Sequence, residues 1–538
     1  MNNFPEITLS LPGGWETILE QPGRERLEAL LPAFFRNCRW FGGKARTIKQ
    51  IAITDALPMP GRKTPTGLLI CRVIYTDNQV EDYLLPLSST SGANARLISS
   101  RHPGAILAHT GSGQSKGILF DGARDPVFMK NCFDFIARSK HAAGARGTLA
   151  ALPGRALLSF INTGQKPPEP HRLQKEQSNT SFLYGHLFIL KLYRRLAEGI
   201  HPEVEMNRFL TEKTTFNNIA HFAGLIELHS SGDRKTAIGL LQSFVEHESD
   251  AWTYSLEAVN RYLKNAPLGL TPPLSLPQVP DAFSQWAGEK YLEEIELLGR
   301  RTAQLHRALA SDPGDPAFSP EPFTLSYQES LYLSMLSLVK QAFRSLRETM
   351  ERLPPETREE VAGLLSVEAS ILGRLRRIEM SKVSGMKIRI HGDYHLGQIL
   401  CTGDDFVIID FEGEPARPPA ERRRKRSPLV DVAGMIRSFH YAAYGAIFLR
   451  DAADPEEVAL LSPWAELWQR TISKIFLSSY LGTMRESPGL LPETTAELNL
   501  MLEAYLLEKA VYELYYELNN RPDWVIIPLR GLRNLMNL

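Results

Sequence analysis

The sequence has few cysteines, no net charge and no long apolar stretch. The four cysteines Cys38, Cys71, Cys132 and Cys401 lie far apart and form no CxxC pair, which excludes a disulfide framework and favours a reducing compartment. Lys+Arg and Asp+Glu both number 61, which excludes a long-range electrostatic trap for nucleic acid or anionic membranes. No apolar run approaches the roughly 20 residues that cross a bilayer, and the first fifteen residues lack the features of a signal peptide. We expect a soluble, cytoplasmic protein that binds neither nucleic acid nor membrane.

The chain changes character near residue 250. Hydrophobic residues make up 43% and charged residues 23% of the sequence, as in ordinary globular proteins. Strand patterns occur before this point and long helical patterns after it. We predict four parts: a cap subdomain at 1–95, an intermediate region at 96–170, a β-rich lobe ending in a hinge at 171–247, and a helical lobe at 248–538.

Periodicity also predicts individual elements. The predicted helices are Glu25 to Phe35, Ala282 to Leu309, Ser326 to Leu353, Glu356 to Met380, Pro463 to Met484 and Thr494 to Asn520. The predicted strands of the first part are Gly67 to Ile74 and Asp82 to Leu85.

One short β-like island, residues 388–415, interrupts the helices with the sequence IRIHGDYHLGQILCTGDDFVIIDFEGEP. Gly392 allows a tight turn before Asp393 because glycine accepts a positive φ. Two short strands flank a turn centred near position 404, which places Gln398 and Asp410 at equal distances from it. Their side chains, and Asp393, are therefore expected near the open end of one hairpin.

Two carboxylates and an amide oxygen are hard ligands that suit Mg²⁺. In phosphoryl transfer, one carboxylate deprotonates the attacking hydroxyl, while an amide and a second carboxylate hold metal. We predict Asp393 as the base and Gln398 and Asp410 as magnesium ligands. Two alternatives are an exposed aspartate turn, and an HxDxH metal cluster of a hydrolase made by His391, Asp393 and His395. In the hypothesis we favour, His395 is a structural histidine that bonds a backbone carbonyl.

The upstream β-rich lobe contains a lysine within the apolar run FILKLY. Lys191 must pair or reach water there, and a helix with Pro202 at its start follows. A strand lysine facing a glutamate of the next helix positions ATP phosphates in kinases. We favour Glu205 as this glutamate, with Glu203 as the alternative; an edge lysine reaching water is the competing interpretation.

Two further segments complete the predicted nucleotide site. The polar run Ser178, Asn179, Thr180 and Ser181 is short enough to close over phosphates, although it is neither GxGxxG nor a Walker loop. The strand Ile238 to Val245 is expected to end in the hinge that receives adenine, with Gln242, Phe244 and Val245 as the contacts.

Motifs along nearly the whole chain resemble those of the maltokinases, which are related to aminoglycoside and choline kinases. The resemblance rests on RWFGGKAR (Arg39 to Arg46), EQSNTS (Glu176 to Ser181), LKLYRRL (Leu190 to Leu196), HPEVE (His201 to Glu205), HGDYHLGQ (His391 to Gln398), DFEGEP (Asp410 to Pro415), RKRSPLVDVAGMIRSFHYAA (Arg424 to Ala443) and EKAVYELYYELNNRPDW (Glu508 to Trp524). It implies an α+β, bilobal protein-kinase-like (aminoglycoside phosphotransferase-like) fold with an N-terminal cap subdomain.

The resemblance also implies a reaction. A maltokinase transfers the γ-phosphoryl group of ATP, with Mg²⁺, to the anomeric hydroxyl of maltose, and the maltose 1-phosphate feeds α-glucan (glycogen) synthesis from trehalose. The same pattern assigns Asp393 as base, Gln398 and Asp410 as magnesium ligands, and Lys191 with Glu205 as the phosphate-positioning pair. It further implies association with trehalose synthase, and we expect a monomer or weak dimer.

Sugar contacts are expected from a C-terminal helix. Tyr512 and Tyr516 are four residues apart and share a helix face, and aromatic faces pack on the apolar side of sugar rings. We predict both tyrosines, with His391 and Arg437, as maltose contacts; tyrosines at this spacing that simply belong to the core are the alternative.

Several competing hypotheses stay open at this point. The chain is also compatible with a non-catalytic, kinase-fold partner of trehalose synthase, or with a related kinase for another sugar or amino alcohol. For the basic run Arg422 to Arg426, a solvated loop is favoured over a nucleic-acid or anion patch. For His306, a structural histidine within a helix is favoured over a functional one.

Overall fold

The computed structural model describes residues 8–9, 23–61, 66–111, 117–173, 178–232, 234–267, 272, 281–353, 355–415, 417–448 and 454–537. The chain divides into two compact units: unit 1 comprises Met1–Glu212 and Ala220–Glu246, and unit 2 comprises Lys213–Ile219 and His247–Leu538. The predicted segment Glu176–Gln177 lies outside the described residues. The four-part division of the chain stays a prediction.

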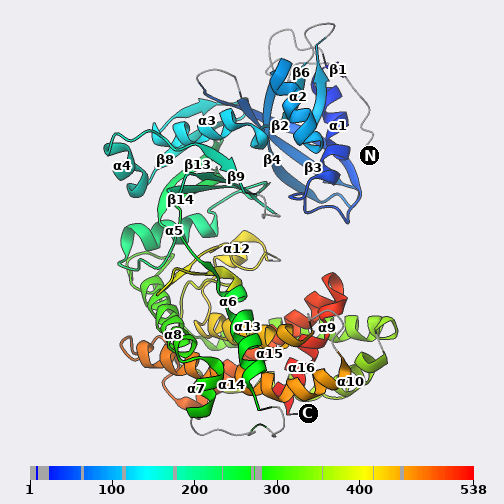
Figure 1. Ribbon diagram of the computed structural model, residues 1–538, viewed down its shortest axis with the longest axis vertical. Helices are drawn as coiled ribbons and strands as arrows, with labels where there is room; N and C mark the ends of the chain where they lie inside the picture. The colour runs from blue at the N-terminus through cyan, green and yellow to red at the C-terminus, as the bar shows by residue number, and fades with distance from the viewer. Residues whose placement is uncertain are drawn as a thin grey trace. The chain divides into compact units, whose positions relative to one another are not determined.

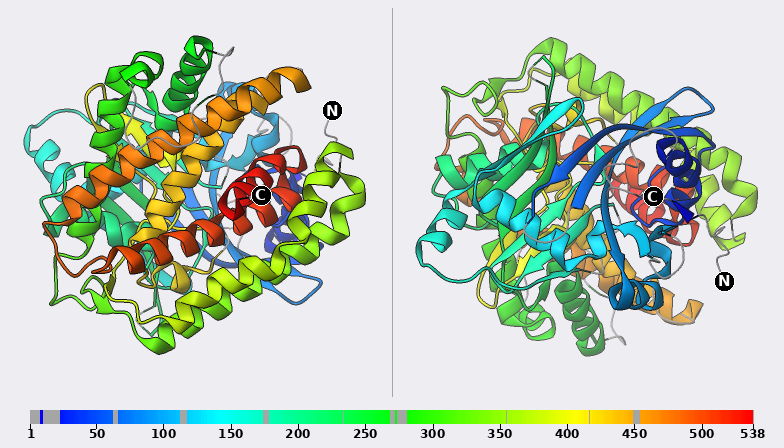
Figure 2. Two further views of the ribbon diagram at one scale, coloured as in Figure 1. Left: turned by 90° about the horizontal axis from the view of Figure 1, so that it is seen from below. Right: turned by 90° about the horizontal axis from the view of Figure 1, so that it is seen from above.

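The first sheet of unit 1 is mostly antiparallel. Its strands follow the order β1 (Thr8–Leu9), β5 (Ile106–Thr110), β6 (Gly117–Asp121), β4 (Val80–Ser91), β3 (Thr66–Tyr75) and β2 (Ile48–Met59). Helix α1 (Gly23–Asn37) buries Leu27, Leu31 and Phe35 in the core that it shares with this sheet (Figures 1 and 2). The strands and the helix predicted for this part are confirmed. Strand β2 was not predicted because Asp55 and Pro58 interrupt the alternation of its apolar residues.

The second sheet of unit 1 carries the predicted lysine. Its order is β7 (His141–Ala143), β8 (Gly147–Pro153), β13 (Phe222–Ser230), β14 (Arg234–Ser243), β11 (Phe188–Leu192), β10 (Thr180–Tyr184) and β9 (Pro170–Arg172). Residues of α3 (Pro126–Ala137) and Leu157 of α4 (Arg155–Asn162) belong to the same buried core as strands of this sheet. Helix α5 (Pro202–Lys213) begins at Pro202, as predicted.

One chain segment connects the two sheets directly. Immediately after β11 the chain forms β12 (Arg195–Leu196), which pairs with β4 of the first sheet. Arg194, between them, is fully buried and binds Asp121 at 2.8 Å. Its Nε also donates to Thr180 Oγ1 at 2.8 Å, and its guanidinium lies 4.8 Å from the Trp40 ring centroid.

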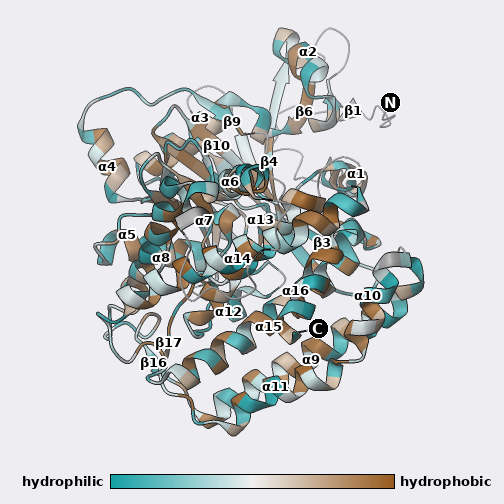
Figure 3. Cartoon of the chain, turned by 60° about the horizontal axis from the view of Figure 1, so that its bottom comes forward, coloured by the Kyte–Doolittle hydropathy of each residue, from teal (hydrophilic) through white to brown (hydrophobic). Residues whose placement is uncertain are grey.

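Unit 2 is mainly helical (Figure 2). Its longer helices are α6 (Ala251–Asn265), α8 (Glu289–Leu309), α9 (Leu325–Thr349), α11 (Glu368–Met380), α13 (Leu429–Phe448), α14 (Pro455–Met484) and α15 (Thr495–Asn520). The shorter ones are α7 (Asp281–Ala287), α10 (Pro355–Leu365), α12 (Pro419–Arg422) and α16 (Ile526–Met536). The predicted helix over 282–309 is divided at Gly288, whose φ of 91° is not helical. Hydropathy alternates along α9 and α15 in Figure 3, as expected for helices with one buried face.

Helix α13 is the buried centre of unit 2. Almost every residue of α13 is buried, and it contacts α6, α14, α15 and α16. The β island forms a small sheet with the order β15 (Ser249–Asp250), β18 (Ile399–Cys401) and β19 (Phe406–Ile408), while β16 (Glu321–Pro322) pairs with β17 (Met386–Lys387). Within the described residues, no helix is both long and apolar enough to cross a membrane.

Candidate active site

The turn before Asp393 is held in place by the buried start of α13. Gly392 has a φ of 81°, as expected for the glycine of this turn. Asp431 is 1% exposed and accepts hydrogen bonds from the backbone N–H of His391 at 2.8 Å and of Gly392 at 2.9 Å. Both donors belong to the turn itself, so the carboxylate of Asp431 fixes the backbone of the turn. It thereby also fixes the position of the next residue, Asp393.

Asp431 is in turn fixed by His306 of α8. His306 Nε2 lies 3.1 Å from Asp431 Oδ2, and its Nδ1 lies 3.0 Å from the hydroxyl of Tyr480. Burial alone would raise the pKa of Asp431, but the hydrogen bond and charge of His306 and the Gly392 N–H lower it overall. The prediction of His306 as a structural histidine is confirmed, whereas Asp431 was not predicted as a support of the turn.

The hairpin brings Gln398 and Asp410 together, with one correction to the register. Ile399 pairs with Ile408, so Gln398 lies opposite Ile409 and not opposite Asp410. Gln398 Nε2 nevertheless donates to Asp410 Oδ2 at 3.0 Å. Asp410 has a φ of 65°, a left-handed conformation that costs a non-glycine residue about 1–3 kcal/mol and is typical of functional sites.

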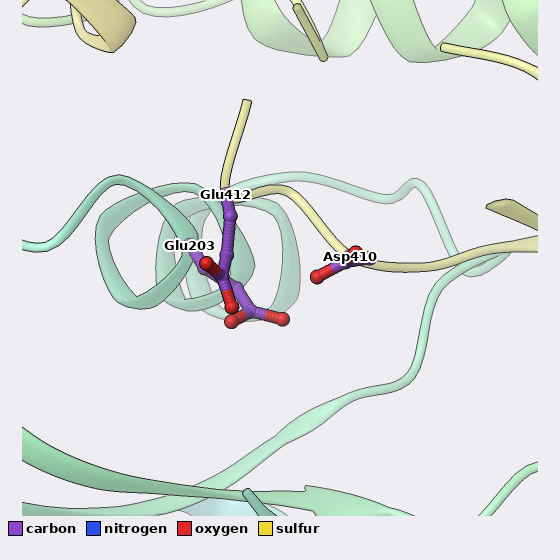
Figure 4. A group of neighbouring side chains, drawn as sticks. All are labelled: Glu203, Asp410 and Glu412. Carbon is purple, nitrogen blue, oxygen red and sulfur yellow. The ribbon is translucent and has the colours of Figure 1, made fainter. Parts of the chain in front are cut away.

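A further carboxylate, Glu412, lies close to Asp410 and was not assigned a role from the sequence. Oxygens of the two carboxylates lie within 4.8 Å of each other. Figure 4 shows both side chains on the segment after β19, and it also draws Glu203 on α5. Two carboxylates and an amide oxygen form a hard donor set, so these residues fit Mg²⁺.

Asp393 lies beside a cation and a histidine. Lys509 Nζ of α15 is 3.9 Å from Asp393 Oδ1, and His395 Nε2 is 4.0 Å from Asp393 Oδ2. Burial lowers the pKa of His395, opposed by the charge of Asp393. His395 Nδ1 accepts from the Gly397 N–H at 3.0 Å and does not bond a carbonyl as predicted, so its structural role stays a prediction.

The structure corrects the prediction of His391 as a sugar contact. The residue is 1% exposed; its Nε2 donates to Ile409 O at 2.9 Å, and its Nδ1 accepts from the Asp393 N–H. His391 thus links the turn to the end of β19. Because both ring nitrogens of His391 are hydrogen-bonded to backbone, the three-residue HxDxH cluster of the hydrolase alternative does not form.

Two cavities of unit 2 meet at Asp393. One, of about 490 Å³, has a largely aromatic wall that contains Trp252, Tyr512, Tyr516 and Trp524. The other, of about 580 Å³, is more polar and also contains Asp393 and Tyr512. The two tyrosine rings lie 6.3 Å apart, so the prediction that they share a helix face is confirmed.

Carboxylates of α15 also line the aromatic cavity, and each has an arginine partner. Arg437 binds Glu513 at 2.7 Å, and Arg521 binds Glu517 at 2.7 Å while lying 4.6 Å from the Trp524 ring centroid. Arg437 is only 3% exposed, and its guanidinium is bound to Glu513. The prediction that Arg437 contacts the sugar directly is therefore corrected. The sequence analysis assigned no role to three residues of the motif Glu508 to Trp524, namely Lys509, Glu513 and Trp524.

The predicted lysine of unit 1 pairs with Glu203. Lys191 Nζ lies 3.1 Å from Glu203 Oε2, and the Tyr193 hydroxyl donates to the same carboxylate at 2.7 Å. Glu203, the alternative in the sequence analysis, is therefore the glutamate that pairs, and the preference for Glu205 is wrong. Residues two apart are about 200° apart on a helix, and here Glu203 is the buried one.

The predicted phosphate segment is only partly a loop. Ser178 and Asn179 precede β10, but Thr180 and Ser181 are buried residues of that strand. The Thr180 hydroxyl accepts a hydrogen bond from Arg194, so the structure corrects its prediction as a phosphate-closing residue. Ser181 is paired with Lys191 across the two strands, so their side chains lie on one face of the sheet.

The predicted hinge follows β14. Gln242 is paired with Ile189, two residues before Lys191, and therefore shares the sheet face of the lysine. The backbone N–H of Phe244 donates to Leu187 O at 2.8 Å, which extends the strand pairing, and Val245 follows half-buried. The roles of these residues as adenine contacts stay predictions.

Comparison with known proteins supports the fold and the enzyme class. The model of the maltokinase N-terminal cap domain matches residues 34–125. A glucosamine kinase of Streptacidiphilus jiangxiensis is 22% identical over 445 residues, which are 80% of this chain and 90% of that protein. A glucosamine kinase of Mycolicibacterium smegmatis is 22% identical over 381 residues, 71% of this chain and 82% of that protein.

A solved structure shares the fold. Glucosamine kinase in complex with glucosamine, ADP and inorganic phosphate superposes with a TM-score of 0.63 at 17% identity, covering 95% of this chain and 99% of that one. The resemblance to the maltokinases and the expected α+β kinase-like fold with an N-terminal cap are confirmed. The enzyme class is that of an ATP-dependent phosphotransferase.

Proposed function

We propose that this chain phosphorylates the anomeric hydroxyl of maltose with ATP, giving maltose 1-phosphate for α-glucan synthesis from trehalose. The observation that carries the proposal is the position of Asp393 in the walls of two cavities, one of them lined by Trp252, Tyr512, Tyr516 and Trp524. Aromatic faces are suited to the apolar sides of sugar rings. The maltokinase cap supports maltose as the acceptor.

The reaction follows from the side chains around the turn. The acceptor hydroxyl oxygen forms a bond to the γ-phosphorus, the bond from that phosphorus to the β–γ bridging oxygen breaks, and Asp393 takes the hydroxyl proton. Lys509 lies 3.9 Å from Asp393 and places a cation beside the base. Gln398, Asp410 and Glu412 would hold Mg²⁺, which supplies neutralisation of phosphate charge when bound.

Lys191 is proposed as the cation that positions the ATP phosphates. Its link to Glu203 fixes the ammonium on the face of the second sheet, and Gln242 lies on the same face. We propose Phe244 and Val245 as adenine contacts, and Ser178 and Asn179 as the part of the polar segment that approaches phosphate.

Glucosamine is a second candidate acceptor. Two curated relatives named glucosamine kinases favour it. A kinase for another acceptor and a non-catalytic partner of trehalose synthase are the remaining alternatives.

One assay distinguishes these functions. Purified protein, ATP and Mg²⁺ are incubated with maltose, glucosamine, glucose, trehalose or an aminoglycoside, and ADP release is measured while phosphorus NMR identifies the product. Maltose-dependent turnover that is lost in Asp393→Asn and kept in Asp404→Asn supports the proposal, since Asp404 is an exposed residue of the hairpin turn. Turnover with glucosamine alone supports the second candidate, and no turnover with any acceptor contradicts both.

We also propose a cytoplasmic monomer or weak dimer that associates with trehalose synthase. Light scattering after size exclusion measures the mass of the protein alone and mixed with that enzyme. A tetramer or larger species of the protein alone contradicts the first part, and two unchanged elution peaks in the mixture contradict the second.

A further inference from the structure

The basic run of the sequence lines a separate cavity of unit 2. This cavity has a volume of about 590 Å³ and lies next to the polar cavity beside Asp393, with which it shares Arg417 and Arg426. Four consecutive cations, Arg423 to Arg426, line it, together with Lys387, Arg389 and Arg417. Four of the five residues of the run therefore line this wall, in which Arg424 is exposed and Arg423, Lys425 and Arg426 are half-buried.

Positive charge exceeds negative charge in this wall. Two carboxylates, Glu321 and Glu421, line the cavity. Two more lie behind it and bind its arginines: Glu414 contacts Arg417, and Glu508 contacts Arg426 at 3.0 Å. Among the residues that the structure describes, seven cations and two carboxylates line this wall, which gives the concave surface a positive potential.

The cations at the base of the cavity are buried and fixed. Arg389 is 1% exposed, and its guanidinium lies 5.4 Å from the Phe318 ring centroid. The Lys425 side chain is 7% exposed, and its Nζ donates to Pro316 O at 2.7 Å. Burying charged side chains is costly, so such a base differs from the mobile lysines and arginines of an ordinary surface.

Hydroxyl groups complete the wall opposite the basic run. Ser330 and Ser334, four residues apart on α9, line the cavity with Tyr327. Cations are the partners that a phosphate group prefers, because each charge-assisted hydrogen bond to it is strong. The remaining volume is in the range of small-molecule sites.

We propose that this cavity binds the phosphate group of a small phosphate ester, such as a sugar phosphate, at a site distinct from Asp393. The phosphate of such a ligand contacts Arg423 and Arg424, and the buried Arg389 adds positive charge to the same wall. The sugar of the ligand extends toward Ser330 and Ser334. An extended nucleic acid is a poorer match, because the cavity is compact and the whole chain has no net positive charge. The proposal does not depend on the acceptor sugar of the kinase reaction.

The test measures binding by calorimetry without ATP, Mg²⁺ or acceptor. The probes are glucose 6-phosphate, inorganic phosphate and glucose, and the variant is Arg424→Glu, which changes an exposed residue that lines neither cavity beside Asp393. The control is Arg344→Glu, an equal charge change at an exposed position of α9 outside these cavities. We expect glucose 6-phosphate to bind the wild type, and Arg424→Glu to weaken it at least about tenfold.

The outcomes separate the proposal from its alternatives. The proposal is supported if Arg424→Glu loses binding of glucose 6-phosphate while Arg344→Glu changes the affinity less than twofold. It is also supported if Ser330→Glu, which places a carboxylate in the same cavity, weakens binding as much as Arg424→Glu does. If inorganic phosphate binds as tightly as glucose 6-phosphate, the ligand of this phosphate site is free phosphate. Four results would overturn the proposal. They are no binding of any phosphate compound, binding of glucose alone, equal losses of binding in Arg424→Glu and Arg344→Glu, and tighter binding of an RNA oligonucleotide that depends on Arg424. Because no turnover is measured, failure here leaves the kinase proposal unaffected.

Discussion

Replacing Asp431 by asparagine tests whether a buried carboxylate holds the catalytic turn. The carboxylate is 1% exposed and accepts from two backbone N–H groups, those of His391 at 2.8 Å and Gly392 at 2.9 Å. A hydrogen bond to a charged group contributes about 1.5–3 kcal/mol, and one between neutral groups about 0.5–1.5 kcal/mol. The two donors use different carboxylate oxygens, and asparagine offers only one acceptor oxygen, so it keeps one bond in neutral form and loses the other. This predicts a decrease of about 3–4 kcal/mol in the free energy of unfolding.

Urea unfolding at pH 7 measures this decrease, with Asp404→Asn as the control. Asp404 is exposed in the hairpin turn, so the control is expected to change stability by less than about 0.5 kcal/mol. We also expect kcat of Asp431→Asn to fall at least about tenfold, because displacement of the turn misplaces Asp393.

The pH dependence gives the test its sign. The pKa of Asp431 is lowered in the folded chain. The ionised carboxylate therefore contributes its full stabilisation at pH values above the pKa of the unfolded chain, about 3.9, and this stabilisation is lost as the pH falls through the lower pKa of the folded chain. The stability difference between the wild type and Asp431→Asn should therefore shrink below about pH 4. A difference under 0.5 kcal/mol at pH 7, or one that stays constant down to pH 2, would refute the reasoning.

Three further substitutions test the site. Asp393→Asn should lower kcat by about 10²- to 10⁴-fold with little change in the sugar KM, as expected for loss of a general base; a kcat within tenfold of wild type would contradict that role. Tyr516→Ala should raise the sugar KM about three- to tenfold without unfolding, because this ring is 41% exposed in the aromatic cavity; unchanged kinetics would remove it from the site. Glu203→Gln should raise the ATP KM and lower kcat about tenfold or more, since its carboxylate holds Lys191 at 3.1 Å. The matched Glu205→Gln should stay within about twofold, and equal effects of the two substitutions would show that the Lys191–Glu203 pair does not position ATP.

Local pairing was predictable from the sequence. The hairpin between β18 and β19 has a short turn, so counting residues from its centre places Gln398 and Asp410 together, and their side chains are hydrogen-bonded. The predicted centre of the turn was wrong by half a residue. Asp410, which has a positive φ, nevertheless reaches Gln398. A left-handed aspartate is not visible in a pattern of apolar and polar residues.

Helix phase was harder to predict than helix position. The start of α5 at Pro202 is correct, but the sequence could not decide between Glu203 and Glu205. Both are acidic residues of the first turn, and which of them faces the sheet depends on how the helix packs. Burial of Glu203 against Tyr193 settles it.

Contacts between distant segments were not predictable from periodicity. His306 and Asp431 are 125 residues apart, and their contact depends on the packing of α8 near the start of α13. A buried histidine and a buried aspartate each look like ordinary polar positions of apolar helices. The same holds for Lys509, which approaches Asp393 from α15 across more than a hundred residues.

The segment from β11 to β12 makes the first sheet inseparable from the second. Arg194 lies on this segment, with Asp121 of one sheet and Thr180 of the other as its partners. A shortened protein that begins after residue 125 would retain the arginine and lose its acid, leaving an uncompensated cation where water now has no access. Chimaeras that exchange this region between relatives should therefore keep the arginine and aspartate from the same parent, and any truncation should be designed with Arg194 replaced.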